Sequence, residues 1–581
     1  MVARRLAVLV ALVLAAPACE SPSVPGRADA TASATAAPDI TFGDAPTTDA
    51  TTATTPSDAT TATTPSDATT ATTPSDATTA TIPSDATTAT TPSDATAPSD
   101  TTTSPDVVSN GTVTVGAPDR ILIVGTVVTP DVSFDGSVLV VGAHIVCAEA
   151  GAACSANTYA NGATVIDTDG GVIAPGFIDT HNHILFDIFD DDDWLPEKLY
   201  TNHTQWPKEA RYIAMLDMKQ CLEDASQGKP AYCPAKYDGA GSLKCEMDKW
   251  GELKGVIAGT TSIVGLPGTS SGCFASLARS IDSPQNDLDE DHIQTSALFP
   301  PSKTSADGVC GNFADSSTDA YLIHVGEGTD AKALGEFAKL GTVSTTPGCL
   351  DAPETVITHG TAFTATEFAV MAQHDMKLAW SPASNVALYG ATTNIPAALD
   401  AGILIALAPD WSMGGSQNIL DEMRFAAAWD DAHFGDRLDA RDLVEMTTKN
   451  AAEVLALDDR LGYLAAGYLA DLVVVQGGGD PYAALVAARP ASVMLTMVGG
   501  VVLYGDQAIQ PAAPQAPGCE AMDVCGQPKF VCVAESSSDN KLNQTYAQIR
   551  AALETGLEDV DAASTSDGFD FAPIAPLVHC E

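Results

Sequence analysis

The sequence predicts an α/β fold: a (β/α)8 barrel with a small β-sandwich domain built from segments on both sides of the barrel. Residues 176–459 alternate short apolar runs with amphipathic segments, as in "TVITHG" followed by "TATEFAVMAQHD". This alternation is typical of strand–helix units with parallel strands, and the stretch is long enough for the eight units of a barrel, about 250 residues. The segments 107–175 and 460–508 are rich in β-branched residues interrupted by Gly, Pro and Asp, which favours the strands and turns of the sandwich. A doubly wound open sheet is the alternative, but no Gly-rich phosphate loop follows the first strand.

The N-terminus predicts export. In residues 1–18, Arg4 and Arg5 precede the apolar run Leu6–Ala16, which is too short to span a bilayer as a helix and is typical of a signal peptide. The run ends in "AAPAC" and resembles the lipobox of bacterial lipoproteins. That resemblance implies lipidation of Cys19 and a protein anchored to a membrane, in the periplasm or at the cell surface. An ordinary secretory signal cleaved nearby is the alternative.

Residues 19–106 predict a stalk between the anchor and the folded part. They contain five copies of a nine-residue unit, "TTATTPSDA", over residues 51–95, with one change at Ile82. The unit repeats Pro and has almost no large apolar side chain, so it cannot bury a core. We therefore expect this segment to be disordered.

Cysteine content and charge restrict the environment and the partners. The chain has 13 cysteines and a formal net charge of −48. Twelve cysteines remain without Cys19, and no CxxC pair occurs, so we expect disulfide bonds in an oxidising compartment. Cys147 and Cys154 could close one short loop, and four cysteines lie in a C-terminal extension, residues 509–581. The negative charge would repel nucleic acids and anionic membranes, so we expect no nucleic-acid partner and membrane contact only through the lipid anchor.

Polar side chains stand at the ends of four apolar runs in the predicted barrel. They are His181 and His183 in "FIDTHNH", His324 and Glu327 in "YLIHVGE", His359 in "VITHG" and Asp410 in "ILIALAPD". Alternate residues of a strand share a face, and the carboxyl ends of all parallel barrel strands open onto one side. Imidazoles and a carboxylate that converge there predict a site for a divalent metal ion, with zinc as the first candidate. For any one histidine, a hydrogen-bonded core position is the alternative.

The order of these residues resembles the amidohydrolase superfamily of metal-dependent hydrolases. "IAPGFIDTHNH" is similar to the family's first barrel strand, and "LAAGYLADLVVV" to the segment that returns to the small β domain. Three details resemble the branch of cytosine and guanine deaminases and triazine chlorohydrolases. They are Glu327 three residues after His324, "SPASN" at 381–385, and the last barrel strand with its helix in "DAGILIALAPDWSMGGSQNILDEMR".

The resemblance implies one divalent metal ion, zinc or alternatively iron, held by His181, His183, His324 and Asp410. Asp410 would also take a proton from the water that the ion activates. Glu327 would exchange protons with a ring or amide nitrogen, and His359 would polarise the developing oxyanion. The implied reaction is hydrolysis of a carbon–nitrogen bond in a small molecule, of the deaminase or aminohydrolase type.

Alternatives to this function remain open. One is a binuclear enzyme or a lactam or peptide amide hydrolase, similar to imidazolonepropionase or a dipeptidase; binuclear members use a carbamylated barrel lysine, a role that neither Lys254 nor Lys303 fits well. Another is a surface binding protein on a barrel that has lost its activity, although no residue of the polar set is missing. The acidic run Asp190–Asp193 could select a cationic substrate or hold calcium, or could be a solvated turn. The substrate and the oligomeric state are not predicted.

Overall fold

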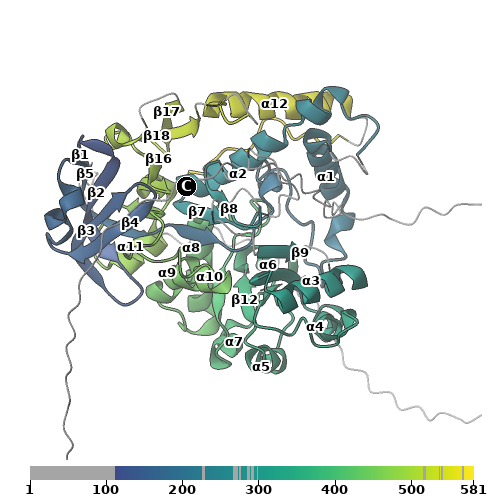
Figure 1. Cartoon of the computed structure of the whole chain (residues 1–581). Helices are drawn as coiled ribbons and strands as arrows, with labels where there is room; N and C mark the ends of the chain where they lie inside the picture. The colour runs from purple at the N-terminus through teal and green to yellow at the C-terminus, as the bar shows by residue number, and fades with distance from the viewer. Residues whose placement is uncertain are drawn as a thin grey trace, which may run out of the picture. The chain divides into compact units, whose positions relative to one another are not determined.

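A computed structural model describes residues 111–580, except for ten short gaps at 225–228, 266–272, 274–275, 284–287, 289–292, 297–298, 515–517, 536, 538–540 and 565–567. The signal peptide, the lipidation site Cys19 and the stalk lie outside the described residues and stay predictions, as do the proposed domain boundaries. Within the described part of the chain, no helix combines the length and the apolar character needed to cross a membrane. Figure 1 shows the helices and strands.

Eight parallel strands follow one another in chain order, as a barrel requires. They are β6 (Phe177–Asp179), β7 (Thr260–Ile263), β8 (Arg279–Ser280), β9 (Ile293–Ser296), β10 (Ala320–Val325), β11 (Thr355–His359), β12 (Lys377–Trp380) and β13 (Ile405–Leu407). Strands β6 to β8 form one sheet and β9 to β13 another. An isolated parallel bridge between Asn182 and Asp410 joins the two sheets beyond β6 and β13. The α/β class and the barrel order of the strands are as predicted, but the described residues record no pairing of β8 with β9, so a closed barrel is not detected.

Helices connect these strands where the sequence has its amphipathic segments. The helices between and after the barrel strands are α1 (Ala210–Glu223), α2 (Lys244–Ile257), α3 (Lys303–Asp315), α4 (Ala331–Val343), α5 (Ala365–Gln373), α6 (Pro382–Tyr389), α7 (Ile395–Asp400), α8 (Ile419–Trp429), α9 (Ala440–Thr447) and α10 (Lys449–Val454). Local capping sets several of their starts: Thr364 and Glu367 form a capping box at α5, and the Asn418 side chain accepts hydrogen bonds from two backbone N–H groups at the start of α8.

The two segments that flank the barrel share one ten-stranded sheet. Its strands are β1 (Thr112–Thr114), β2 (Ala117–Val128), β3 (Ser133–Val141), β4 (His144–Ala150), β5 (Ala163–Pro175), β14 (Leu472–Val475), β15 (Val493–Val498), β16 (Val501–Asp506), β17 (Gly518–Val524) and β18 (Gln527–Ala534). Antiparallel pairing of β14 with β5 joins the flanks. The structure does not confirm the predicted sandwich of two sheets. The alternation of side chains along the sequence predicts strands, but it does not tell whether the strands form one layer or two.

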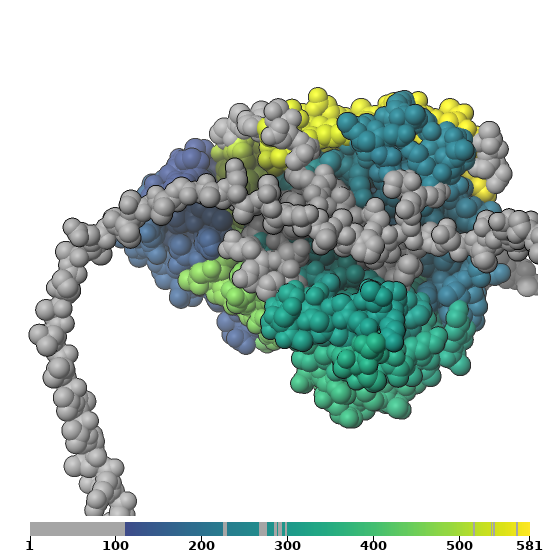
Figure 2. All heavy atoms as spheres, turned by 45° about the vertical axis from the view of Figure 1, so that its right-hand side comes forward, coloured from purple at the N-terminus to yellow at the C-terminus, as the bar shows by residue number. Residues whose placement is uncertain are grey.

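The C-terminal extension is folded against the rest of the described chain. Strands β17 and β18 add to the edge of the large sheet, and α12 (Tyr546–Ala563) contacts α1 and α2. In Figures 1 and 2 this extension is the yellow part of the molecule, next to the blue-teal residues of α1 and α2. As expected, twelve cysteines pair, in the combinations 147–154, 221–233, 245–273, 310–349, 519–532 and 525–580.

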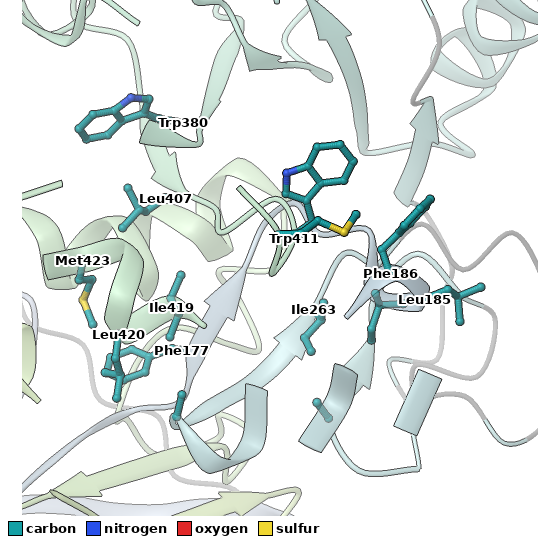
Figure 3. Close-up of a cluster of buried hydrophobic side chains, with 14 of the residues drawn as sticks. Phe177, Leu185, Phe186, Ile263, Trp380, Leu407, Trp411, Ile419, Leu420 and Met423 are labelled. Atoms are coloured by element: carbon teal, nitrogen blue, oxygen red, sulfur yellow. The ribbon is translucent and has the colours of Figure 1, made fainter. Parts of the chain in front are cut away.

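The main hydrophobic core fills the space around the barrel strands. Figure 3 shows part of it, with Phe177 of β6 and Leu407 of β13 near side chains of α8, and Ile263 of β7 on the side of Leu185. Most barrel strands are buried along their whole length, as the five residues of β11 illustrate, and β9 and β12 keep half-buried positions. This burial explains why most of them read as continuous apolar runs. Phe186 and Trp411 belong to the same core, with ring centroids 6.1 Å apart.

Candidate metal centre

Four histidines and an aspartate gather at the carboxyl ends of the barrel strands. His181 and His183 follow β6, His324 lies near the end of β10, His359 ends β11 and Asp410 follows β13. The ring centroid of His181 lies 4.9 Å from that of His183 and 4.6 Å from that of His324. Nε2 atoms of His181 and His183 lie 3.0 and 3.5 Å from the same Asp410 Oδ1. The structure thus brings together the side chains that the four strand ends supply for a metal.

Backbone and side-chain hydrogen bonds hold the first histidine pair against Asp410. The His183 N–H donates to the Asp410 carbonyl at 2.7 Å, and the Asp410 N–H donates to the His181 carbonyl at 3.0 Å. Asp179 accepts from the His181 N–H at 3.1 Å and from the Asn182 side chain at 2.9 Å. The turn "DTHNH" is therefore fixed from both sides.

Two of these residues adopt backbone conformations that L-residues rarely take. His359 has φ 72° and Asp410 has φ 73°. Such a residue costs about 1–3 kcal/mol and persists only where the surrounding structure enforces it. Here both side chains are turned at strand ends towards the same group of ligands, which places the strain at the candidate site.

Burial keeps the imidazoles neutral. It lowers the pKa of His181 and of His324 to about 3, and lowers the pKa values of His183 and His359 well below the ordinary value. A neutral ring is the form that can ligate a metal ion. Side-chain atoms of His181, His324 and His359, and of His181, His183 and Asp410, lie within 4.8 Å of one another, so the donor set fits a divalent ion.

The second ring nitrogen distinguishes His324 from His359. Nδ1 of His324 lies 3.1 Å from the Ser296 carbonyl oxygen, which can only accept, so Nδ1 carries the proton and Nε2 keeps a lone pair for a metal. The Asn385 amide lies 2.9 Å from Nδ1 of His359 and donates to it, while its oxygen accepts from the hydroxyl of Thr361 at 3.0 Å. His359 therefore carries its proton on Nε2 and can donate it into the site.

Helix α6 positions three of the site residues. It begins in the "SPASN" segment, where Ser384 hydrogen-bonds Asp410 and Asn385 holds His359. One turn further on, the Tyr389 hydroxyl donates to Glu327 Oε1 at 2.6 Å. The sequence analysis missed Tyr389, although its distance of four residues from Asn385 places both on one face of a helix.

Glu327 lies buried beside this group. Burial raises its pKa to about 7, so the carboxyl group is partly protonated at neutral pH. Tyr389, which donates to it, accepts in turn from the Trp206 indole N–H at 3.0 Å. A buried carboxyl group with a pKa near neutrality suits general acid–base work.

Aromatic side chains pack together next to His183. They are Phe186, Trp194, Trp206, Tyr212 and Trp411, and the Trp411 ring lies 5.5 Å from that of His183. Figure 3 shows Trp411 and Phe186 of this aromatic wall side by side. The Tyr212 hydroxyl and the Trp411 indole nitrogen are buried without a hydrogen-bond partner. Phe186, Trp194 and Trp206 lie between β6 and α1, Tyr212 lies in α1, and Trp411 follows β13. No sequence motif marks them.

The acidic run Asp190–Asp193 and the lysines Lys254 and Lys303 do not belong to the group of candidate metal ligands. Asp190 pairs with His579 at 3.1 Å, Asp191 accepts from the Gly414 N–H at 2.7 Å and Asp193 accepts from the Asp190 N–H. The Lys254 ammonium donates to Gln417 Oε1 at 3.1 Å, and Lys303 begins α3.

Residues 312–503 match the Amidohydrolase family. The chain thus carries an amidohydrolase family domain, which defines its class. Similar curated proteins include the 5-methylthioadenosine/S-adenosylhomocysteine deaminases of Thermococcus onnurineus, 26% identical over 343 residues (54% of this chain, 76% of the relative), and of Bacillus cereus, 26% identical over 336 residues (55% of this chain, 76% of the relative). At the level of this class, the prediction of a hydrolase that acts on carbon–nitrogen bonds is confirmed.

The likeness to a solved structure bears only on the fold of this chain. An adenosine deaminase from Xanthomonas campestris with bound zinc aligns with a TM-score of 0.51 and 16% identity, over 77% of this chain and 99% of that chain. This likeness agrees with an α/β barrel as the framework of the metal centre.

Proposed function

We propose that the protein is a mononuclear metal-dependent aminohydrolase that releases an amino group from a nitrogen heterocycle, as in the deaminase and triazine hydrolase branch of the superfamily. The observation that carries the proposal is the combination of a histidine–aspartate ligand group with a buried carboxyl group, Glu327, whose pKa is about 7. In the proposed deamination, Glu327 supplies the proton for the ring nitrogen next to the carbon under attack.

The ligands in this proposal are His181, His183, His324 and Asp410. The lone pair of His324 is free for this role because its Nδ1–H is directed to the Ser296 carbonyl. A divalent ion, zinc in the first place, supplies a water of lowered pKa and a Lewis acid when bound. The placement of Lys254 away from the histidines favours one ion over a lysine-bridged pair.

Three side chains transfer protons or donate hydrogen bonds in the proposed reaction. Asp410 is a stronger base than an exposed aspartate because burial raises its pKa, and it takes the proton of the attacking water. Glu327 donates its proton to the ring nitrogen next to the carbon under attack. The Nε2–H of His359 hydrogen-bonds the oxygen as negative charge develops on it.

The aromatic wall supports a planar substrate. Rings of Trp206, Tyr212 and Trp411 lie 4.9–6.3 Å from one another, a spacing typical of aromatic packing. Aromatic side chains beside a few polar groups are typical of small-molecule sites. The deaminase relatives carry purine-containing compounds in their names, and we place amino-purines first among the substrates to be tested.

We further propose that the enzyme works outside the cytoplasm, held to a membrane through Cys19. Six disulfides support an oxidising compartment, because such bonds are rare in reducing ones. The lipobox-like "AAPAC" supports the anchor.

Metal content and ammonia release together test the proposal. The exported protein should contain about one zinc or iron per chain and release ammonia from an amino-purine or a related amino-heterocycle. Asp410→Asn should lose activity and hold the metal more weakly while the protein remains folded. Two metal ions per chain with amide hydrolysis would favour the binuclear alternative, and absence of both metal and activity after reconstitution would favour a barrel that has lost its function.

A further inference from the structure

A second group of carboxylates lies at the far end of α8, away from the ligands of the metal centre in the sequence. We call it the α8 corner: Asp430, Asp431 and Asp436. After α8 the chain forms a π-helical turn, Asp430–Phe434, and then reverses at Gly435 and Asp436. One oxygen from each of the three carboxylates lies within 4.8 Å of the others. None of the three belongs to the amidohydrolase ligand set.

One carboxylate oxygen of the α8 corner is buried and unpaired. Asp430 is only 1% exposed. Its Oδ2 accepts from the Leu438 N–H at 3.0 Å, but its Oδ1 has no hydrogen-bond partner. Leaving a buried carboxylate oxygen without a donor or a cation is costly, so the free oxygen itself points to a ligand.

In the described part of the chain, no cationic side chain pairs with this corner. Among the described residues, no Lys, Arg or His forms an ion pair with the three carboxylates; the nearby Arg437 pairs with Asp400 at 2.7 Å, and His433 stacks on Trp429. The carboxyl end of α8 adds negative potential from its macrodipole. A cation from solution would therefore find uncompensated negative charge at this corner.

We propose that the α8 corner binds a calcium ion. Its donors are oxygens only, which suits a hard cation and excludes zinc as the preferred ion. Calcium bonds oxygens at about 2.3–2.6 Å, so ligands on opposite sides of the ion lie about 4.6–5.2 Å apart, whereas Mg²⁺ requires a tighter, near-octahedral set. The carboxylates of Asp430, Asp431 and Asp436 supply three negative charges against the two positive charges of the ion, and water completes its coordination. The proposal does not depend on the reaction at the metal centre.

The bound ion would brace the connection between α8 and α9. Asp430 follows α8 directly, and Asp436 lies three residues before Asp439, which caps α9. Calcium would thus clamp the end of one helix to the segment that starts the next. We expect a gain in stability and no direct effect on catalysis.

Terbium luminescence tests the site on the zinc-loaded protein. Tb³⁺ replaces Ca²⁺ and is sensitised by nearby tryptophan, here Trp429, which precedes Asp430. We expect a saturable signal that Ca²⁺ displaces and that Mg²⁺ displaces at least about tenfold less well. Asp431→Asn/Asp436→Asn should abolish the signal; Asn tolerates the left-handed backbone at position 436.

A matched variant controls for charge. Asp458→Asn/Asp459→Asn removes the same two charges at exposed positions and should keep the full signal. Calcium should raise the thermal midpoint of the wild type and of this control by about 2–4 °C, but not that of the corner variant. No Ca²⁺-displaceable signal in the wild type, or equal signals in both variants, would overturn the proposal.

Discussion

His324 and His359 are both buried but have different neighbours at Nδ1. A carbonyl oxygen faces Nδ1 of His324, and an amide N–H faces Nδ1 of His359. The first leaves a lone pair on Nε2 and the second leaves a proton there. The role of each ring is therefore determined by a single hydrogen bond on the side away from the site.

This difference predicts different losses for two matched variants. His324→Asn should reduce the zinc content strongly, because a ligand is missing. His359→Asn should keep about one zinc per chain but lower kcat by about 10²–10³-fold, the effect of losing one oxyanion donor; Asn also tolerates the positive φ of this position. Elemental analysis and ammonia release measure the two effects. Loss of zinc from both variants alike would make His359 a ligand.

The hydrogen bond from Tyr389 to Glu327 predicts a shift in pH dependence. Glu327 donates its proton in the proposed reaction, so kcat/KM should fall as the pH rises through its pKa of about 7. The Tyr389 hydroxyl stabilises the ionised carboxylate and lowers this pKa. Tyr389→Phe should therefore raise the pKa of Glu327 and move the alkaline limb of the profile to higher pH.

A remote tyrosine–glutamate pair controls this experiment. The Tyr463 hydroxyl donates to Glu453 at 3.0 Å, far along the sequence from the site residues. Tyr463→Phe should leave the pH profile where it is. If the alkaline limb of the pH profile does not move in Tyr389→Phe, Tyr389 does not set the pKa of Glu327.

At the scale of elements, α2 packs against the short helix Ile184–Phe186, which follows the "DTHNH" turn of the candidate metal centre. Gly251 of α2 lies so close to Ile184 that a Cβ atom would overlap that side chain, and Ile184 directly follows His183. Gly251→Ala should lower the free energy of unfolding by about 1–3 kcal/mol and weaken zinc binding by displacing His183. Thermal unfolding and zinc titration measure both.

Gly335 of α4 provides the opposite case. A Cβ atom there meets nothing within 4 Å, so Gly335→Ala should raise the free energy of unfolding by about 0.5–1 kcal/mol through helix propensity. Its zinc affinity should not change. If both variants change stability and zinc affinity alike, the packing of α2 on Ile184 is not what holds His183 in place.

At the scale of the molecule, disulfides tie the C-terminal extension to itself and to the sheet. Cys525 in the β17–β18 turn pairs with Cys580, 55 residues away, whereas Cys147 and Cys154 are 7 apart. In the chain-entropy model these bonds contribute about 4 and about 2.5 kcal/mol. Replacing both cysteines of a pair by Ala should lower the thermal midpoint more for 525–580 than for 147–154, measured by calorimetry under oxidising conditions. A reversed order would show that native packing outweighs loop length.

The sequence alone predicted the α/β class of the fold and the side chains that gather at the candidate metal centre. Apolar runs that end in His or Asp predict buried parallel strands, and the common direction of such strands brings their ends together, so His181, His183, His324, His359 and Asp410 could be chosen without coordinates. Contacts between segments distant in the chain could not be chosen in this way. Tertiary structure decided that Tyr389 meets Glu327, that Asn385 sets the proton of His359, that an aromatic wall adjoins His183 and that the flanking strands form one sheet with the C-terminal hairpin. Periodicity records which face of an element is buried, but not which partner covers it.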